Sequence, residues 1–328
     1  MRPFRYLRPT SVEEAVELLA TDPEARPLGG GSDLLGEMKE GITLPGALVA
    51  LSEVPQLREV APLPDGGLAL GATTTLAQME GDPLLQENYT ALAQAAASVA
   101  TPQIRNVATL GGNLCQRPRC WFYRSPLYDC RKKGGAICFA VNGDSKYHAI
   151  LGGRDCFIVH PSDLAVALLA LDGRVEAAGP GGRRTLPAED FFAGPDRDIT
   201  RENVLEPGEL VTGVLLPPPT PGGRSLYLKV RERSSVDFAL VSVAVWARLE
   251  DGRVSEARVA LGGVAPVPWR SREAEEALAG IPVEQVDAEA TGWAAVEGAR
   301  PLRDNHYKIP LAASLVARAV ASLLPQGP

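Results

Sequence analysis

The sequence predicts an α+β protein made of several packed units. At 328 residues the chain is longer than one average domain, so two or three units with a sizeable core are expected. Hydrophobic residues make up 45% and charged residues 22%, as in ordinary globular proteins. Short apolar runs separated by glycine clusters alternate with helical patterns, and the last third alternates in the manner of strands before two helical segments. These patterns favour a mixed fold.

The first third is expected to mix helices with short strands. Residues 10–20 combine an N-cap candidate, Thr10 or Ser11, with carboxylates in the first turn and apolar residues at helical spacing. Apolar runs between glycine clusters follow and are typical of strands. Residues 88–100 are Ala-rich and helical in character, and Pro102 should end that helix.

A stretch rich in cysteine, aromatic residues and glycine, residues 114–157, then interrupts the regular pattern and looks inserted. A helix is expected at 161–171, with Ser162 or Asp163 as its N-cap. A strand-turn-strand region comes next, and its last apolar run leads into a Pro/Gly run that predicts a boundary near residue 220. Three alternating segments and two helical ones beyond it predict a small α+β domain.

Charge and hydropathy exclude several classes of function. The net charge of -7 and the pI near 5.2 argue against a nucleic-acid partner, because affinity for phosphate backbones depends on clustered Lys and Arg. No apolar run is long enough to cross a bilayer, and the N-terminus lacks the pattern of a signal peptide. We therefore expect a cytoplasmic protein without a membrane span.

Two glycine-rich loops are candidates for anion binding. Gly29, Gly30 and Gly31 are adjacent and would let backbone N–H groups approach a pyrophosphate, although a tight turn explains such a triplet equally simply. The pattern is not the G-x-G-x-x-G of a Rossmann turn. A second loop, residues 109–113, offers a hydroxyl, two glycines and an amide. Two such loops in one chain favour a dinucleotide ligand.

All five cysteines fall within a stretch of 42 residues. Disulfides are disfavoured in the cytoplasm, so clustered thiols there more often bind metal. Four thiolates complete a 4Fe-4S or a zinc site. The separations between the last four cysteines are irregular, with no C-x2-C pair, and match neither a zinc ribbon nor a ferredoxin. Spacing alone leaves metal ligands and buried structural cysteines as alternatives.

Five segments in order carry a resemblance to a known family: RPLGGGSDLLGEMKEG, TPQIRNVATLGGNL, HPSDLAVALLAL, YLKVRERSSVDFALVSVAV and LGGVAPVPWR. Together they resemble the FAD-binding, medium subunit of the xanthine dehydrogenase and CO dehydrogenase family of molybdenum hydroxylases. The resemblance implies a two-subdomain FAD-binding fold of the vanillyl-alcohol-oxidase type, with residues 1–60 as its first subdomain and residues 61–220, including the insertion 114–157, as its second. Residues 221–328 would form the family's small α+β C-terminal domain.

The resemblance also implies where FAD would bind. The first loop would wrap the pyrophosphate, and the second would form the other wall of the groove; their residues are Pro27, Leu28, Gly29, Gly30, Gly31, Ser32, Asp33 and Leu34, and Thr109, Leu110, Gly111, Gly112 and Asn113. Asp163 would sit close to FAD, with a simple N-cap as its alternative role. Lys229 would approach the flavin ring, where a positive charge stabilises reduced flavin. Asp237 is a further candidate.

For the insertion, the chain is similar to the FAD subunit of 4-hydroxybenzoyl-CoA reductase, whose cysteine-rich insertion binds a 4Fe-4S cluster that plain family members lack. Cys120, Cys130, Cys138 and Cys156 match the ligand positions, whereas Cys115 belongs to the second glycine loop. The outer spacings differ from that relative, with residues 147–150 in the extra length. Lys132 and Lys133 would then lie near the cluster surface, either as a docking patch or as a solvated loop, and we interpret His148 and His160 as structural.

These implications give an FAD-dependent electron-transfer subunit. Its partners would be a large molybdopterin-binding subunit, a small subunit with 2Fe-2S clusters, and a ferredoxin or other one-electron carrier. The sequence supplies no Ser/His/Asp or Cys/His set, so no catalytic residue is predicted, and the substrate would bind elsewhere in the complex. The alternatives are a zinc-stabilised, non-catalytic assembly module and a free-standing FAD oxidoreductase.

Overall fold

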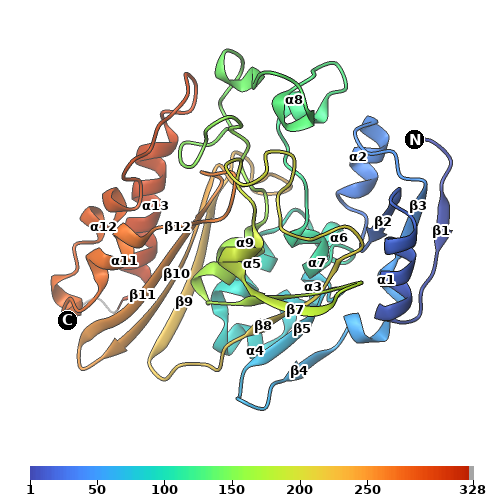
Figure 1. Ribbon diagram of the computed structural model, residues 1–328. Coiled ribbons are helices and arrows are strands. Elements are labelled where there is room, and N and C mark those ends of the chain that lie inside the picture. The colour runs from blue at the N-terminus through green and yellow to red at the C-terminus, as the bar shows by residue number, and fades with distance from the viewer. Residues whose placement is uncertain (325–328) are drawn as a thin grey trace.

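A computed structural model describes residues 1–324 and confirms the mixed α+β fold, which is built on three separate sheets. The N-terminal sheet lies at one side of the molecule and the C-terminal sheet at the other, with the middle sheet and a group of helices between them (Figure 1). The cysteine-rich insertion projects from the top of this arrangement. Among residues 1–324 no helix is long and apolar enough to cross a membrane.

The N-terminal sheet has three parallel strands in the order β1-β3-β2, formed by Arg5–Leu7, Ala47–Ala50 and Ala25–Leu28. Helix α1, Val12–Thr21, packs its buried residues against it, and Ser11 is its N-cap, accepting a hydrogen bond from the Glu14 N–H. Helix α2, Leu34–Glu40, directly follows the first glycine loop. Strand β3 is buried throughout, as expected for a central parallel strand.

The middle sheet has five antiparallel strands in the order β4-β5-β8-β6-β7. Two short 3-10 turns, Leu51–Glu53 and Pro55–Leu57, connect it to the first sheet. Its strands are β4 Val60–Pro62, β5 Leu68–Gly71, β6 Arg174–Gly179, β7 Gly182–Pro187 and β8 Leu210–Leu216. The hairpin of β6 and β7 matches the predicted strand-turn-strand region, although its final residues form a short helix, α10, Ala188–Phe191.

Seven helices of this middle region form its core and carry the second glycine loop: α3 Leu76–Gly81, α4 Pro83–Asn88, α5 Thr90–Ser98, α6 Pro102–Arg105, α7 Leu110–Leu114, α9 Asp163–Ala170 and α10. Helix α9 is buried on every side, which explains why its sequence is apolar all round. Helix α5 ends at Ser98, before Pro102, and Pro102 begins the next helix with Thr101 as the N-cap. Helices α5 and α9 pack against the C-terminal sheet, and one hydrophobic cluster contains residues of both helices and of both the middle and C-terminal sheets, so these regions share one core.

The C-terminal sheet is antiparallel in the order β12-β11-β10-β9, with strands Trp269–Arg270, Arg253–Gly262, Val241–Glu250 and Gly223–Val230. Helices α11, Arg272–Leu278, and α13, Lys308–Leu323, occupy the two segments expected to be helical and cover its outer face (Figure 1). A third helix there, α12, Ala288–Ala294, was not predicted. A glycine and a threonine within it weaken the helical pattern.

The insertion contains little regular structure. Its elements are the four-residue helix α8, Trp121–Arg124, and two 3-10 turns, Arg131–Lys133 and Phe139–Val141. An isolated bridge joins Cys130 to Ile137. Phe122, Tyr128 and Phe139 pack on one another with ring centroids 5.1 to 5.9 Å apart. The insertion therefore depends on side-chain contacts instead of a hydrogen-bonded sheet.

Candidate FAD groove and cysteine cavity

The two glycine loops pack directly against each other. A Cβ at Gly30 would lie 1.7 Å from the Val107 carbonyl oxygen, and one at Gly29 would lie 2.6 Å from Thr109 Oγ1. Gly31 has a φ of +72°, which side chains other than glycine rarely adopt. These glycines are therefore required by loop packing, a reason that the sequence analysis did not foresee. Their packing brings segments 27–34 and 109–113 to one place.

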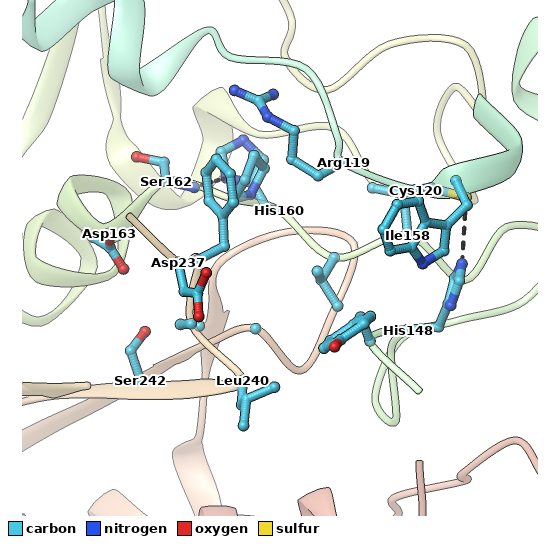
Figure 2. A pocket seen from close by; sticks show the side chains of 18 of the residues that line it. Arg119, Cys120, His148, Ile158, His160, Ser162, Asp163, Asp237, Leu240 and Ser242 are labelled. Atoms are coloured by element: carbon cyan, nitrogen blue, oxygen red, sulfur yellow. Dashed lines mark hydrogen bonds between the residues drawn. The ribbon is translucent and has the colours of Figure 1, made fainter. Parts of the chain in front are cut away.

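A groove runs beside the junction of the loops and consists of two adjoining cavities. The small cavity, about 210 Å³, contains Ser32, Asp33, Gly112, Asn113, Asp163 and Lys229 in its lining. The large cavity, about 650 Å³, lies toward the insertion and shares Asp163, Arg119, Pro161, Asp237 and Phe238 with the small one (Figure 2). The structure thus brings together predicted residues from four distant segments.

The remaining predicted residues do not line either cavity of the groove. Pro27 and Leu28 belong to strand β2, and Leu34 begins helix α2. Thr109 is the N-cap of α7 and accepts a hydrogen bond from the Gly112 N–H, while Leu110 is fully buried. Gly29, Gly30, Gly31 and Gly111 likewise do not line either cavity. These residues therefore belong to elements next to the groove and not to its lining.

Asp163 and Lys229 form a buried ion pair at the wall of the groove. The Lys229 ammonium lies 2.7 Å from the Asp163 carboxylate, and their side chains are 4% and 5% exposed. The Tyr227 hydroxyl donates a 2.5 Å hydrogen bond to the other carboxylate oxygen. Burial first, and then the Asp163 charge, raises the pKa of Tyr227 well above its usual value, so Tyr227 stays a donor. The carboxylate is therefore held by two side chains of strand β9.

The role of a simple N-cap at Asp163 is wrong. Ser162 is the N-cap of α9: its hydroxyl accepts a hydrogen bond from the Ala165 N–H and donates one of 2.6 Å to the Asn113 amide oxygen. This second bond ties α9 to the second glycine loop. The view of Lys229 as a solvated strand lysine, which its residues alone would suggest, is also wrong, because its ammonium is buried against Asp163 and the Ser98 carbonyl.

Several groove residues were not predicted from the sequence, among them Gln116, Arg119 and Phe238. Arg119 comes from the insertion and stacks 4.8 Å above the Phe238 ring, which lies between β9 and β10. Its guanidinium also lies 2.8 Å from Asp33. The only signal for such contacts in the sequence is that the first part of the insertion contains several arginines. Asp237 pairs with Arg233 in the same β9–β10 loop and lines both cavities.

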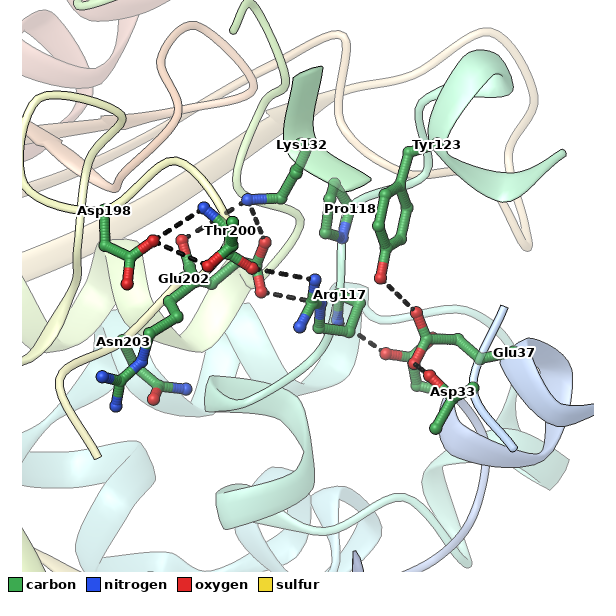
Figure 3. A network of polar contacts seen from close by, with 12 residues as sticks. Asp33, Glu37, Arg117, Pro118, Tyr123, Lys132, Asp198, Thr200, Glu202 and Asn203 are labelled. Carbon is green, nitrogen blue, oxygen red and sulfur yellow. Dashed lines mark hydrogen bonds and ion pairs between the residues drawn. The ribbon is translucent and has the colours of Figure 1, made fainter. Parts of the chain in front are cut away.

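Asp33 connects the first glycine loop to the insertion. Its carboxylate accepts 2.6 Å hydrogen bonds from the Arg117 backbone N–H and the Arg124 guanidinium. It stands at the N-cap position of α2 but makes no side-chain cap bond there. The neighbouring Glu37 is buried and accepts a hydrogen bond from the Tyr123 hydroxyl. The insertion is thus fastened to the element that follows the predicted pyrophosphate loop (Figure 3).

Cys120, Cys130, Cys138 and Cys156 line a single cavity inside the insertion. All are free thiols, and Cys130 and Cys156 are buried. The cavity between these side chains is small, about 10 Å³. Cys115 is absent from this cavity and is instead the C-cap of α7. The four cysteines singled out in the sequence therefore share one site and the fifth stands apart.

The surroundings of the four thiols are mostly apolar and aromatic. Phe122, Phe139 and Ile158 line the cavity with them. Burial raises the pKa of the Cys120 thiol to about 11 and that of Cys156 to about 12. These groups are consequently protonated at neutral pH, and metal binding there would release their protons. The cavity therefore suits a metal group whose thiolate ligands are shielded from water.

The histidines and lysines of the insertion occupy different positions. His148 and His160 are both buried, and His148 Nε2 lies 3.3 Å from the Cys120 sulfur. Lys133 is partly exposed and donates to the Ser125 carbonyl. Lys132 is buried and lies 2.5 Å from the Glu202 carboxylate, so neither a solvated loop nor a docking patch describes it. Short basic runs of this kind are usually solvated. The carboxylate partner of Lys132 is 70 residues away in the sequence and could not be recognised from it.

The large cavity and the cysteine cavity share a wall. Cys120, His148 and Ile158 line both of them, and Figure 2 shows these three side chains together at one end of the large cavity. A group bound at this end of the large cavity would therefore lie beside Cys120, which also lines the cysteine cavity. Such an arrangement permits direct electron exchange between two cofactors.

Comparison with known proteins identifies the family. The description "FAD binding domain in molybdopterin dehydrogenase" matches residues 2–219, and "CO dehydrogenase flavoprotein C-terminal domain" matches residues 226–323. The chain belongs to the FAD-binding subunits of the molybdopterin dehydrogenases. It is therefore similar to oxidoreductase subunits over both parts, and FAD binding is a property of its family. The resemblance stated from the sequence is confirmed at this level.

Curated relatives and solved structures agree with this family. The chain is 36% identical to the aldehyde oxidoreductase FAD-binding subunit PaoB of Escherichia coli K12, over 98% of each chain. It is 29% identical to the putative xanthine dehydrogenase FAD-binding subunit XdhB of the same organism, over 90% of this chain and 86% of that one. The carbon monoxide dehydrogenase of Hydrogenophaga pseudoflava matches with a TM-score of 0.78 and 29% identity over 98% of both chains.

Proposed function

We propose that the chain is an electron-transfer subunit that holds FAD in the groove and a 4Fe-4S cluster in the cysteine cavity. The observation that carries this proposal is the shared wall: Cys120, His148 and Ile158 face both cavities. When bound, FAD exchanges electrons in pairs with one partner and singly with another, and Fe-S clusters carry single electrons. The cluster would thus be an additional one-electron port next to the flavin.

The residues of the groove are suited to bind and orient FAD. Ser32, Gly112 and Asn113 lie in the small cavity, where backbone and side-chain donors of the two loops can bind a pyrophosphate. The loop residues from Pro27 to Gly31 and from Thr109 to Gly111 lie next to this part of the groove. Lys229 brings a buried positive charge to the wall of the small cavity, and its partner Asp163 also lines the large cavity, where the flavin ring would bind. Asp163 would hold that charge in position.

The donors on the cysteine cavity are four thiols, and none of its described lining residues is a carboxylate. Four thiolates around one zinc ion lie about 3.8 Å from one another, as tetrahedral 2.3 Å bonds require. Within residues 1–324, no three His, Cys, Asp or Glu side chains are placed so that they could hold one metal ion. A four-iron cluster needs wider spacing, because each thiolate binds a different iron. The four cysteines on one cavity therefore support Cys120, Cys130, Cys138 and Cys156 as cluster ligands.

A multi-subunit complex is the setting we propose for this chain. The similar proteins are named FAD-binding subunits, and relatives from carbon monoxide dehydrogenase and nicotine hydroxylase are named medium chain or medium subunit. We infer a large molybdopterin-binding subunit, where the organic substrate reacts, and a small subunit with 2Fe-2S clusters. A ferredoxin or another one-electron carrier would exchange electrons with the cluster. A free-standing oxidoreductase would instead need its own substrate site and acid-base groups.

The composition of the purified chain tests the proposal. We expect flavin absorption that bleaches on reduction, a broad shoulder from iron-sulfur charge transfer, and four iron and four sulfide per chain. A colourless protein with one zinc per chain would favour the assembly module. Substrate turnover by this chain alone, without its partner subunits, would favour the free-standing enzyme. FAD without iron would leave the flavin assignment standing and refute the cluster.

A further inference from the structure

A buried lysine stands at the wall of the cysteine cavity. The side chain of Lys132 is 3% exposed and lines the cavity together with the four thiols. Its ammonium donates to the Ile199 carbonyl at 2.9 Å and lies 2.5 Å from the Glu202 carboxylate. Neither oxygen belongs to the insertion, so this lysine joins the insertion to the loop before β8 (Figure 3).

The Glu202 carboxylate forms ion pairs with two cationic side chains, those of Lys132 and Arg117. Its side chain is 2% exposed, and its second oxygen lies 2.7 Å from the Arg117 guanidinium. Arg117 also donates to the Thr200 carbonyl at 3.1 Å. Lys132 and Glu202 therefore form a buried ion pair, whereas the Arg117 side chain is 32% exposed. Because Glu202 is shared with Arg117, it compensates the buried Lys132 charge only in part, and a negative neighbour at the cavity wall would complete the compensation.

The neighbour that fits is a cluster with four thiolate ligands. Lys132 lines the same cavity as the four cysteines, so its positive charge favours thiolates there over neutral thiols. His160 feels the same charge, which together with burial keeps its ring neutral. Lys132 thus already acts electrostatically on groups around the cavity, where a low dielectric strengthens such interactions.

We propose that Lys132 supplies a fixed positive charge that stabilises the thiolate ligands and raises the midpoint potential of the cluster, while Glu202 acts as the counter-charge that limits this effect. The inference rests on the proposed 4Fe-4S cluster. The potentials of Fe-S clusters respond to net charge and to hydrogen bonds around them. A positive charge favours the more negative, reduced state, and its counter-charge opposes it. The two residues should therefore shift the potential in opposite directions.

The test is a redox titration of the assembled holoenzyme, followed by the low-temperature EPR signal of the reduced 4Fe-4S cluster. We expect Lys132→Met to lower the ratio of reduced to oxidised cluster at a fixed potential about tenfold, which for one electron corresponds to about 59 mV. Glu202→Gln keeps the shape of the side chain and should raise the ratio. Lys133→Met is the matched control, since Lys133 adjoins Lys132 but does not line the cavity. The 2Fe-2S signals of the same samples provide an internal reference.

Opposite shifts in Lys132→Met and Glu202→Gln, with Lys133→Met unchanged, support the proposal. Unchanged potentials, or shifts of the same sign, overturn it while leaving the cluster itself in place. If Lys132→Met loses iron, Lys132→Arg decides: recovery of iron by the charge-conserving variant supports the role of the charge, and failure to recover it overturns that role. Wild-type protein without a 4Fe-4S signal refutes the cluster and the inference together.

Discussion

The FAD groove and the cysteine cavity are built in opposite ways. The groove takes Asp33, Asn113, Asp163 and Lys229 from four distant segments, and each is backed by a helix or a strand of the main core. The cavity takes its four cysteines from one continuous stretch with almost no regular structure. The groove is thus a product of the fold, whereas the cavity is attached to it.

The insertion is held in place by polar contacts to the rest of the protein and not by a hydrophobic core of its own. Asp33 holds Arg124, and Glu202 holds Lys132. On the other side, the Asn305 amide donates to the His148 carbonyl at 2.9 Å, and the buried Lys308 ammonium donates to the Tyr147 carbonyl at 3.0 Å. The insertion therefore depends on the flavin-binding body for its shape. The body, whose core lies elsewhere, should depend much less on the insertion.

The largest effect is expected when a proposed cluster ligand is removed. Cys138→Ser should lose nearly all iron yet keep FAD, because Cys138 lines the cysteine cavity and neither part of the groove. Iron, sulfide and FAD contents of the purified holoenzyme measure this. Cys115→Ser is the control, since Cys115 lies on the groove side at the end of α7, and it should keep its iron. Full iron in Cys138→Ser would remove this cysteine from the ligand set.

The reverse experiment alters the groove and spares the cavity. A methyl group at Gly30 would meet the Val107 carbonyl, so Gly30→Ala must force the two glycine loops apart. We expect FAD affinity to fall more than about tenfold, or about 1.4 kcal/mol, measured by flavin release on dilution. Gly36→Ala is the matched control, because nothing lies within 4 Å of a Cβ there. Iron should remain near the wild-type content. Equal loss of iron and FAD would mean that the two sites are one structural unit.

The sequence was sufficient where a local pattern determines the structure. Each helix cap was narrowed to two adjacent candidates, Thr10 or Ser11 and Ser162 or Asp163, because a cap needs only its own side chain and the next turn. The clustering of the thiols in one stretch was visible in the sequence, but the choice of four of the five as ligands came from the family resemblance and not from their spacing. In each case the decisive residues are close in the sequence.

Contacts between distant segments could not be foreseen in this way. Lys132 lies in a run of three basic residues that is typical of a solvent-exposed loop, and only the fold brings Glu202 close to it. The pairing of Asp163 with Lys229 depends on β9 lying beside α9 in the folded core. The packing requirement at Gly30 likewise depends on Val107 in the other loop. Composition and periodicity contain no information on such partners.

The Asp163–Lys229 pair tests how far the groove belongs to the core. Asp163→Asn leaves the Lys229 ammonium buried without a counter-charge, which should destabilise the protein by about 3–5 kcal/mol. Urea denaturation of the FAD-free protein measures this cost apart from any loss of FAD affinity. Glu13→Gln removes an exposed partner of Arg183 and should leave the denaturation midpoint unchanged. A midpoint for Asp163→Asn equal to that of Glu13→Gln would show that the groove is not coupled to the core.

The pH dependence of stability provides a last test at His160, which lies at the boundary between groove and insertion. Burial first, and then the Lys132 charge, lowers the pKa of His160 to about 3 from its usual 6.5. Between these values the unfolded chain binds a proton that the folded chain does not, so stability present above pH 6.5 is lost as the pH falls toward 3. At pH 4.5 this histidine should account for about 2–3 kcal/mol of lost stability relative to pH 7.

His160→Gln should therefore lose less stability between pH 7 and pH 4.5 than the wild type, as measured by urea denaturation at both pH values. Glutamine stays neutral and can still accept the hydrogen bond that the Ser162 N–H donates to the ring at 3.4 Å. His306→Gln, at an exposed position, is the matched control. An identical loss in wild type and His160→Gln would mean that water reaches this ring, and the boundary between groove and insertion would then be more open than its packing against Phe192 indicates.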